Sequence, residues 1–285
     1  MSTLKIAIQK SGRLNEDSIK ILKDCGISIN NGNDQLKATS SNFPLEILFL
    51  RNSDIPQYLL DGVVDCAIIG DNLLQEKGFG ITVIEKLGFS KCRVSVAVPS
   101  HSAYTCAADL EGLRIATSYP QTVTNFFQSR NITVDIHQIS GSVEIAPNIG
   151  LSDAIVDIVS SGSTLFKNNL KELEVIWNSE AVLAVAPEMS DLKKGILANL
   201  QFRIQSVLKA RKSKYILMNV PNAKIVEISA LLPVLKSPTV MPLAEIGWSS
   251  LHSVIDEDRF WEVIGELKNA GAEGILVCPI EKIIL

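Results

Sequence analysis

The sequence lacks the features that mark several large classes of protein. No apolar run approaches the roughly 20 residues that cross a bilayer, and the few apolar residues before Gln9 are too short for a signal-peptide core. The 27 basic and 31 acidic side chains leave a net charge of −4, so the basic excess of nucleic-acid or membrane-surface binders is missing. We expect a cytoplasmic protein with no nucleic-acid or membrane partner, in which a local cationic pocket for a small anion remains allowed.

Cysteine and histidine are scarce as well. The 5 cysteines are odd in number and scattered, without a C-x-x-C pair, so neither a disulfide framework nor a zinc site is predicted. Cys66 lies in an apolar strand context and is expected to be a small core residue. The 3 histidines lie apart from one another, and no Ser-His-Asp or Cys-His arrangement can be assembled from them. Walker and Gly-x-Gly-x-x-Gly patterns are absent too.

Short apolar runs alternate with helical patterns along much of the chain. Its 285 residues predict two or three domains. Strands are predicted at 4–8, 45–50, 66–69 and 113–116, and helices at 15–24, 120–129 and 191–211. Such alternation is typical of α/β folds with mostly parallel sheets. The segment 93–98 suits a strand that crosses into a second lobe, and 173–186 a return.

Residues 215–279 follow a different pattern. Strands are predicted at 215–220, 239–243, 250–255 and 274–279, with helices at 223–232 and 259–268. The order βαββαβ is that of the ferredoxin-like split unit. Because this part holds no catalytic constellation, we expect a binding or regulatory role for it.

The sharpest candidate site is the segment 153–165, where an apolar strand leads into a turn rich in hydroxyls and glycine. Small residues let backbone N–H groups converge on a phosphate, and a following helix start adds a favourable dipole. Asp157, just upstream, could accept hydrogen bonds from sugar hydroxyls. The combination suits a ribose-5-phosphate group bound by Ser160, Ser161, Gly162, Ser163 and Thr164. The alternative is a capped turn with Ser163 or Thr164 as the N-cap, and Asp153 capping its own segment.

Polar residues also follow three predicted strands, where ligands of open α/β sheets bind. Lys10 and Arg13, with Gly12 between them, could grip phosphates, or be surface cations of a solvated turn. Arg51 could neutralise a pyrophosphate, or pair with Asp54. Asp71 could accept from an adenine amine or a ribose hydroxyl, or cap a helix that begins at Asn72.

Glu144 lies in a bend, Gly-Ser-Val-Glu-Ile-Ala-Pro, that would hold a carboxylate rigidly. It could bind a sugar or magnesium. Alternatively it is an acidic residue at a helix start, where the dipole favours negative charge.

Together these motifs resemble a known family, the ATP phosphoribosyltransferases in their long form. The similarity runs through the chain in order, in segments 9–14, 51–56, 61–65, 114–120, 141–147, 153–165 and 275–282. It implies a glycosyltransferase that joins ATP to 5-phosphoribosyl 1-pyrophosphate with Mg²⁺, giving N1-(5-phosphoribosyl)-ATP and pyrophosphate, the first step of histidine biosynthesis. It also implies feedback inhibition by histidine and a homo-oligomer, dimer or hexamer.

The resemblance further implies roles for the candidate residues. Ser160–Thr164 would hold the 5-phosphate of the ribosyl donor, with Asp157 near its ribose, and Lys10 and Arg51 would balance charge on the pyrophosphate. ATP would be placed by Gly12, Arg13, Leu14 and Asp71, and Glu144 would lie near the ribose or the magnesium ion. The inhibitor histidine would bind near Leu235, Ser237, Thr239 and Ala272.

The implied architecture is a bilobed catalytic part, like a periplasmic solute-binding protein, followed by an ACT-type regulatory domain. The boundaries are expected at 1–91 and 183–211 for lobe I, 92–182 for lobe II, and 212–285 for the regulatory domain. A different class of function is the alternative: a bilobed module that binds or senses a small anion or an amino acid without catalysis. The phosphate-directed residues favour the enzyme, because a passive amino-acid binder has no need of so many such groups. The fold alone would not decide between the two.

Overall fold

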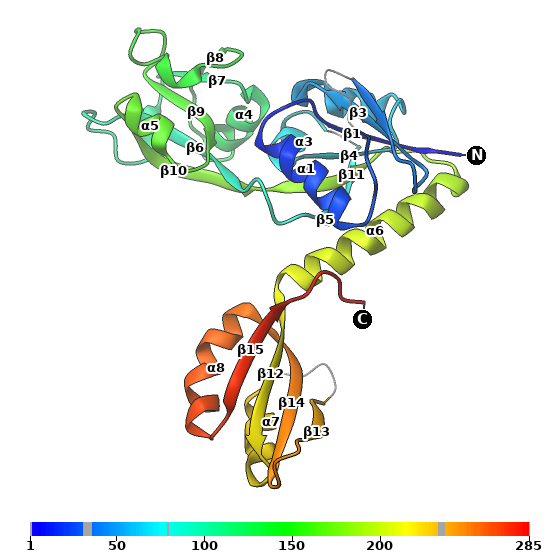
Figure 1. Cartoon of the computed structure of the whole chain (residues 1–285). Helices are drawn as coiled ribbons and strands as arrows, with labels where there is room; N and C mark the ends of the chain where they lie inside the picture. The colour runs from blue at the N-terminus through cyan, green and yellow to red at the C-terminus, as the bar shows by residue number, and fades with distance from the viewer. Residues whose placement is uncertain (1, 31–35, 79, 233–236, 285) are drawn as a thin grey trace. The chain divides into compact units, whose positions relative to one another are not determined.

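The computed structural model describes residues 2–30, 36–78, 80–232 and 237–284. The chain divides into two compact units, the first made of residues 1–23 and 27–197 and the second of residues 24–26 and 198–285. The first unit contains two sheets, each the centre of a lobe, and the second unit contains one (Figure 1).

Lobe I is built on a six-stranded sheet in the order β2 (Lys37–Thr39), β3 (Leu45–Leu50), β1 (Leu4–Gln9), β4 (Cys66–Gly70), β11 (Ala181–Val185) and β5 (Thr82–Lys86). Its central strands are buried on both faces, as the apolar runs predicted. Helices α2 (Ile55–Leu60) and α3 (Asp71–Lys77) pack on one face through an apolar cluster. Helix α1 (Arg13–Asp24) follows β1, and Cys66 is confirmed as a core residue.

Lobe II has a five-stranded sheet in the order β10 (Leu170–Ser179), β6 (Cys92–Pro99), β9 (Ala154–Val159), β7 (Arg114–Thr117) and β8 (Asp135–Gln138). Helix α4 (Pro120–Gln128) packs on one face with Phe126 and Phe127. The short helix α5 (Ser163–Lys167) and the 3₁₀ turn η3 (Val143–Ile145) pack on the other face, through Leu165 and Val143. Both faces are therefore covered, while the strand ends stay available for a site.

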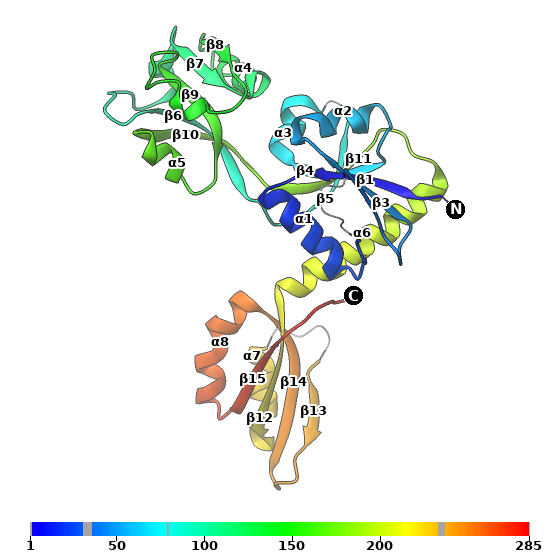
Figure 2. The same cartoon turned by 45° about the horizontal axis from the view of Figure 1, so that its top comes forward.

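The prediction of mostly parallel sheets is wrong. Strand β1 is parallel to β3 and β4, and β7 is parallel to β8 and β9, but β11 is antiparallel to both its neighbours and β6 to both of its own. The cause is the way the chain changes lobes: β5 leads into β6, and β10 into β11, with no helix between them (Figure 2). Without a crossover helix to reverse the chain, β6 and β11 run opposite to most strands of the sheets that they enter.

The second unit confirms the predicted βαββαβ order. Its antiparallel sheet has the order β13 (Thr239–Pro242), β14 (Trp248–Asp256), β12 (Ser213–Pro221) and β15 (Glu273–Pro279). Helices α7 (Ile225–Leu231) and α8 (Glu257–Asn269) contribute Ile228, Phe260 and Leu267 to its core. The bilobed part together with this unit confirms the expected fold class.

Helix α6 (Asp191–Arg211) has the bounds that the sequence predicts, and the division between the units falls within it, between residues 197 and 198. The expected division at 211 assigns the whole helix to lobe I, and the functional division of the chain stays a prediction. Across the described ranges, no helix has both the length and the apolar character needed to cross a lipid bilayer.

Candidate active site

Three predicted residues follow the carboxyl ends of neighbouring strands in lobe I. Lys10 follows β1, Arg51 follows β3 and Asp71 follows β4, and these strands are parallel neighbours. The backbone N–H of Lys10 donates to the carbonyl oxygen of Leu50 at 2.7 Å, which fixes Lys10 beside the start of the Arg51 turn. The structure thus brings these residues to one edge of the sheet, the edge where open α/β sheets bind ligands.

Lys10 and Arg51 are exposed, and among the described residues neither side chain has a hydrogen-bond or ion-pair partner. The alternative pairing of Arg51 with Asp54 is not formed; Asp54 accepts from the Ser53 hydroxyl at 2.9 Å. Two unpaired cations at a strand edge are suited to an anionic ligand.

The turn between β1 and α1 has a conformation that requires glycine. Gly12 has a φ of +87°, in the region where other residues are strained. Arg13 is largely exposed, with its Nε 4.0 Å from an Asp17 carboxylate oxygen. Leu14 is buried, so only its backbone is available to a ligand there.

Asp71 is the first residue of α3, and the N-cap is Gly70. The alternative that Asp71 caps a helix beginning at Asn72 is therefore wrong. Burial raises the pKa of the Asp71 carboxyl, and the charge of Lys86 opposes that rise.

In lobe II, β9 leads into the predicted phosphate loop. Ser160, Ser161, Ser163 and Thr164 are exposed, and the hydroxyls of Ser161 and Ser163 lie 3.0 Å apart. Gly162 is the N-cap of α5 with a φ of +79°. Neither Ser163 nor Thr164 is the cap, because the left-handed bend needs a residue without a Cβ.

A salt bridge that the sequence did not reveal braces this loop. The Arg93 guanidinium donates to the carbonyl oxygen of Ser160 at 3.1 Å and grips both carboxylate oxygens of Glu172. The hydroxyl of Ser95 donates to the same carboxylate at 2.8 Å. Because Arg93, Ser95 and Glu172 come from adjacent strands, no local spacing could have identified them. They hold the backbone of Ser160 in place.

Asp157 is two residues from both Ile155 and Val159 along β9, so the three side chains point to the same face of the sheet. Ile155 and Val159 pack against η3 and α5, which cover that face. Burial raises the pKa of the Asp157 carboxyl to about 6, partly offset by the hydrogen bond from the N–H of Ile158, and the charge of Glu144 adds to the rise. Glu144 belongs to η3, which packs on this same face of the sheet through Val143. Asp153, by contrast, is structural: Arg114 grips it with two hydrogen bonds.

Tyr119 and Asn72 lie beside predicted site residues, and the sequence did not single them out. Burial raises the pKa of the Tyr119 hydroxyl above its usual range, and the charge of Asp157 raises it further. The side-chain amide of Asn72, next to Asp71, donates to this hydroxyl at 3.2 Å. These two residues link the strand ends of lobe I to those of lobe II.

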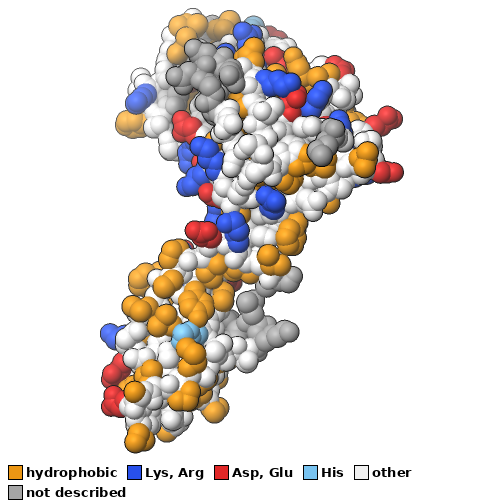
Figure 3. Space-filling model, turned by 45° about the vertical axis from the view of Figure 1, so that its right-hand side comes forward, with side chains coloured by type: hydrophobic (Ala, Val, Ile, Leu, Met, Phe, Trp, Pro, Cys, Tyr) orange, Lys and Arg blue, Asp and Glu red, His pale blue; other side chains and the backbone are white. Residues whose placement is uncertain are grey.

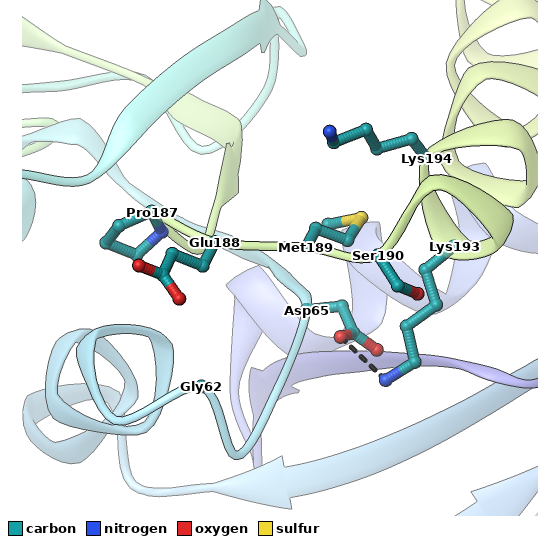
Figure 4. A pocket seen from close by; sticks show the side chains of 8 residues that line it. All are labelled: Gly62, Asp65, Pro187, Glu188, Met189, Ser190, Lys193 and Lys194. Carbon is teal, nitrogen blue, oxygen red and sulfur yellow. Dashed lines mark hydrogen bonds and ion pairs between the residues drawn. The ribbon is translucent and has the colours of Figure 1, made fainter.

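The hollow drawn in Figure 4, of about 630 Å³, lies elsewhere and contains none of the predicted site residues. In it the Asp65 carboxylate accepts from the Lys193 ammonium and from the backbone N–H of Lys5, each at 2.8 Å. Since the ion pair satisfies both side chains, we assign Asp65 the structural role of joining the start of β4 to α6.

The residues that the sequence predicts to bind the inhibitor histidine do not lie together within one copy of the chain. Leu235 lies outside the described residues. Ser237 and Thr239 are exposed at and before β13, whereas Ala272 is buried just before β15. Strands β13 and β15 are opposite edges of the four-stranded sheet, roughly 14 Å apart at the usual strand spacing.

The comparisons with known proteins identify the family. A family model described as ATP phosphoribosyltransferase matches residues 51–206, and one described as HisG, C-terminal domain, matches residues 210–282. The chain belongs to the ATP phosphoribosyltransferase family. A protein of this name from Cytophaga hutchinsonii is 58% identical over the full length of both chains, and one from Phocaeicola vulgatus is 54% identical over 99% of this chain and 100% of its own.

Among solved structures, the ATP phosphoribosyl transferase (HisG:HisZ) complex from Thermotoga maritima is similar, with a TM-score of 0.63 and 29% identity. The match covers 73% of the present chain and 99% of the matched chain of that complex. The predicted long-form family, the transferase activity and its place in histidine biosynthesis are confirmed. These relatives are named as the enzyme, so the non-catalytic binding module is set aside.

We predict that Arg93→Ala raises the KM for phosphoribosyl pyrophosphate by roughly tenfold or more, because the loop loses its charge-assisted brace. Initial rates at varied concentrations of each substrate test this. Arg130→Ala is the matched control, since Arg130 pairs with Glu174 on the same strand as Glu172 and no bond joins it to the loop. Equal effects of the two substitutions would contradict the assigned role.

Proposed function

We propose that this chain joins adenine N1 of ATP to the anomeric carbon of 5-phosphoribosyl 1-pyrophosphate at the strand ends of its two lobes. The observation that carries the proposal is the loop 160–164, which presents four exposed hydroxyl side chains and the first turn of α5 at the end of β9. Hydroxyls and free backbone N–H groups at a helix start bind phosphate. In this proposal Ser160, Ser161, Gly162, Ser163 and Thr164 hold the 5-phosphate, and Asp157 accepts from the ribose hydroxyls.

The leaving pyrophosphate falls to Lys10 and Arg51. Their lack of an ion-pair partner among the described residues supports this role, because a cation already paired would have to give up its partner first. ATP is placed by Gly12, Arg13, the backbone of Leu14, and Asp71. The first three residues follow the same strand as Lys10, and Asp71 follows β4, which is paired with that strand.

The chemistry needs little from a proton-transfer group. Adenine N1 already presents a lone pair, whereas the anomeric carbon becomes cationic and the pyrophosphate gains negative charge in the transition state. Cations and oriented N–H groups that meet this charge lower the barrier. Holding the two substrates in line supplies the remaining acceleration. The isolated histidines of the sequence agree with such a mechanism.

Magnesium fits this site as an ion held mainly by substrate. No cluster of three or more acidic, histidine or cysteine side chains capable of binding a metal occurs in the part of the chain that the structure describes. Asp157 and the turn η3 that holds Glu144 lie on one face of the sheet, and Mg²⁺ is commonly bound by one or two carboxylates together with phosphate oxygens and water. In that position Glu144 and Asp157 would hold the ion, which would neutralise charge on the pyrophosphate.

Arg51→Ala is expected to lower kcat by about a hundredfold while changing the KM for ATP by no more than about threefold, because leaving-group charge grows only in the transition state. Steady-state pyrophosphate release measures both parameters. Lys37→Ala is the control, as Lys37 is paired with Glu46 in the same sheet. An unchanged kcat would remove Arg51 from the mechanism.

The raised pKa of Asp157, about 6, predicts a pH dependence. Below that pH the carboxyl of the free enzyme is protonated and accepts ribose hydroxyls poorly. The kcat/KM for phosphoribosyl pyrophosphate should therefore fall as pH drops through 6. Substrate phosphates titrate near the same pH, so the comparison is with Asp157→Asn, whose profile keeps only the substrate limb. Parallel profiles would show that Asp157 is not the titrating group.

We further propose that the second unit binds histidine as the inhibitor, at a site shared by two copies of the chain. The support is the placement of Thr239 and Ala272 at opposite sheet edges, since a single free amino acid does not span them. Exposed apolar side chains occur on this unit, as Figure 3 shows, and they favour association of copies. Tyr215, Met241 and Leu276 share the sheet face that the helices leave uncovered.

The double variant Ser237→Ala with Thr239→Ala should raise the histidine concentration for half-inhibition by about tenfold or more, through loss of hydrogen bonds to the inhibitor. Its uninhibited rate should match that of the unmodified chain. Ser229→Ala, on helix α7 of the same unit, is the control. Inhibition unchanged in the double variant would place the histidine site elsewhere.

A further inference from the structure

Two side chains one turn apart on α3 reach from lobe I into lobe II. Asn72 is 4% exposed and Glu76 is 6% exposed. Residues at positions i and i+4 lie on one face of a helix, so the two act on the same neighbour. That neighbour is the start of α4 and the residue before it.

Glu76 caps α4 from the other lobe. One carboxylate oxygen accepts from the backbone N–H of Gln121 at 2.9 Å, and the other accepts from the N–H and the hydroxyl of Thr122, both at 2.8 Å. These N–H groups are in the first turn of the helix, where no intrahelical partner exists. The N-cap residue, Tyr119, provides no side-chain cap of its own. The carboxylate therefore satisfies the helix start and interacts favourably with its dipole.

Asn72 links Tyr119, just before α4, to Ser179, at the end of β10 where the chain passes between the lobes. Its backbone N–H donates to the hydroxyl of Ser179 at 2.9 Å, and that hydroxyl donates to the Asn72 side-chain oxygen at 3.1 Å. The Asn72 side-chain amide donates to the Tyr119 hydroxyl. Ser179 ends β10 and is paired with Cys92, the first residue of β6, so it stands where the chain passes between the lobes.

Neither lobe needs these bonds for its own core. The cluster beneath α3 consists of residues from lobe I, and the cluster beneath α4 of residues from lobe II. A buried carboxylate is costly unless several donors meet it, and here all three donors come from the opposite lobe. The arrangement stabilises one relative position of the lobes.

We propose that Asn72 and Glu76 form an interlobe clamp that sets the distance between the ATP-directed end of α3 and the ribose-directed Asp157. Both are positioning residues: Asn72 is adjacent to Asp71, and Tyr119, whose hydroxyl it holds, follows β7, the strand paired with the one that carries Asp157. A misplacement of about 1 Å between reacting groups can cost a hundredfold in rate. The clamp rests on the proposed assignment of one substrate to each lobe.

The test uses Thr122, whose hydroxyl donates to Glu76. Thr122→Val removes the donor, Thr122→Ser keeps it, and Thr124→Val is the control on the same helix, because Thr124 donates only to the carbonyl of Pro120. With the clamp weakened, each lobe still binds its own substrate. We expect Thr122→Val to lower kcat by roughly tenfold, with both KM values within about twofold, and Thr122→Ser and Thr124→Val to turn over like the unmodified chain.

Glu76→Gln adds a second measurement. Its side-chain NH₂ group replaces a carboxylate oxygen that accepts hydrogen bonds, so it faces the donors of α4 with another donor. This substitution should lower kcat more than Thr122→Val does, while dissociation constants for each substrate alone stay within about twofold. A normal kcat in both Thr122→Val and Glu76→Gln overturns the clamp. Equal losses in Thr122→Ser and Thr122→Val also overturn it. If the unmodified chain itself releases no pyrophosphate, the proposed function fails rather than the clamp.

Discussion

Negative charge is the constraint on which the site depends. Both substrates are polyanions, the leaving group gains further charge, and the chain itself has a net charge of −4. Several cations are paired elsewhere: Arg93 with Glu172, Arg114 with Asp153, and Lys193 with Asp65. Lys10 and Arg51 remain without a partner in the described part of the chain, and both follow strands at one sheet edge. In the proposed function, these two cations meet the negative charge of the leaving pyrophosphate within an acidic protein.

Positioning is the second requirement, and buried hydrogen bonds supply it. Arg93 fixes the backbone of Ser160 from a neighbouring strand. Glu76 and Asn72 join α3 to the start of α4 and to Tyr119. In our account these bonds hold two binding surfaces in register, because charge stabilisation is effective only when the reacting atoms are aligned. The short strand crossings between the lobes make such cross-lobe bonds possible.

Local patterns in the sequence predicted much of the fold. Short continuous apolar runs predicted the central strands, which are buried on both faces. Both ends of α6 were predicted correctly because its helical pattern is long. Strand ends and small residues also led to Lys10, Arg51, Asp71 and the loop 160–164, since these signals depend on a few adjacent positions. The resemblance to a family gave the reaction itself.

The rest depended on contacts between distant segments. The mostly parallel sheet was wrong because β10 passes into β11 without a helix, which alternation alone does not reveal. Gly162, rather than a hydroxyl residue, caps α5 because of its left-handed backbone. Glu76 and Arg93 look like ordinary surface charges in the sequence, and only their partners, 45 and 67 residues away, give them a role.

The most direct test of the central claim is pyrophosphate release by the unmodified chain with ATP, phosphoribosyl pyrophosphate and Mg²⁺, compared with mixtures that omit one substrate. The account predicts release only when both substrates are present, together with an equal amount of product in which the ribose is attached at adenine N1. Release without ATP, or from either substrate alone, would contradict a direct transfer between substrates held on the two lobes.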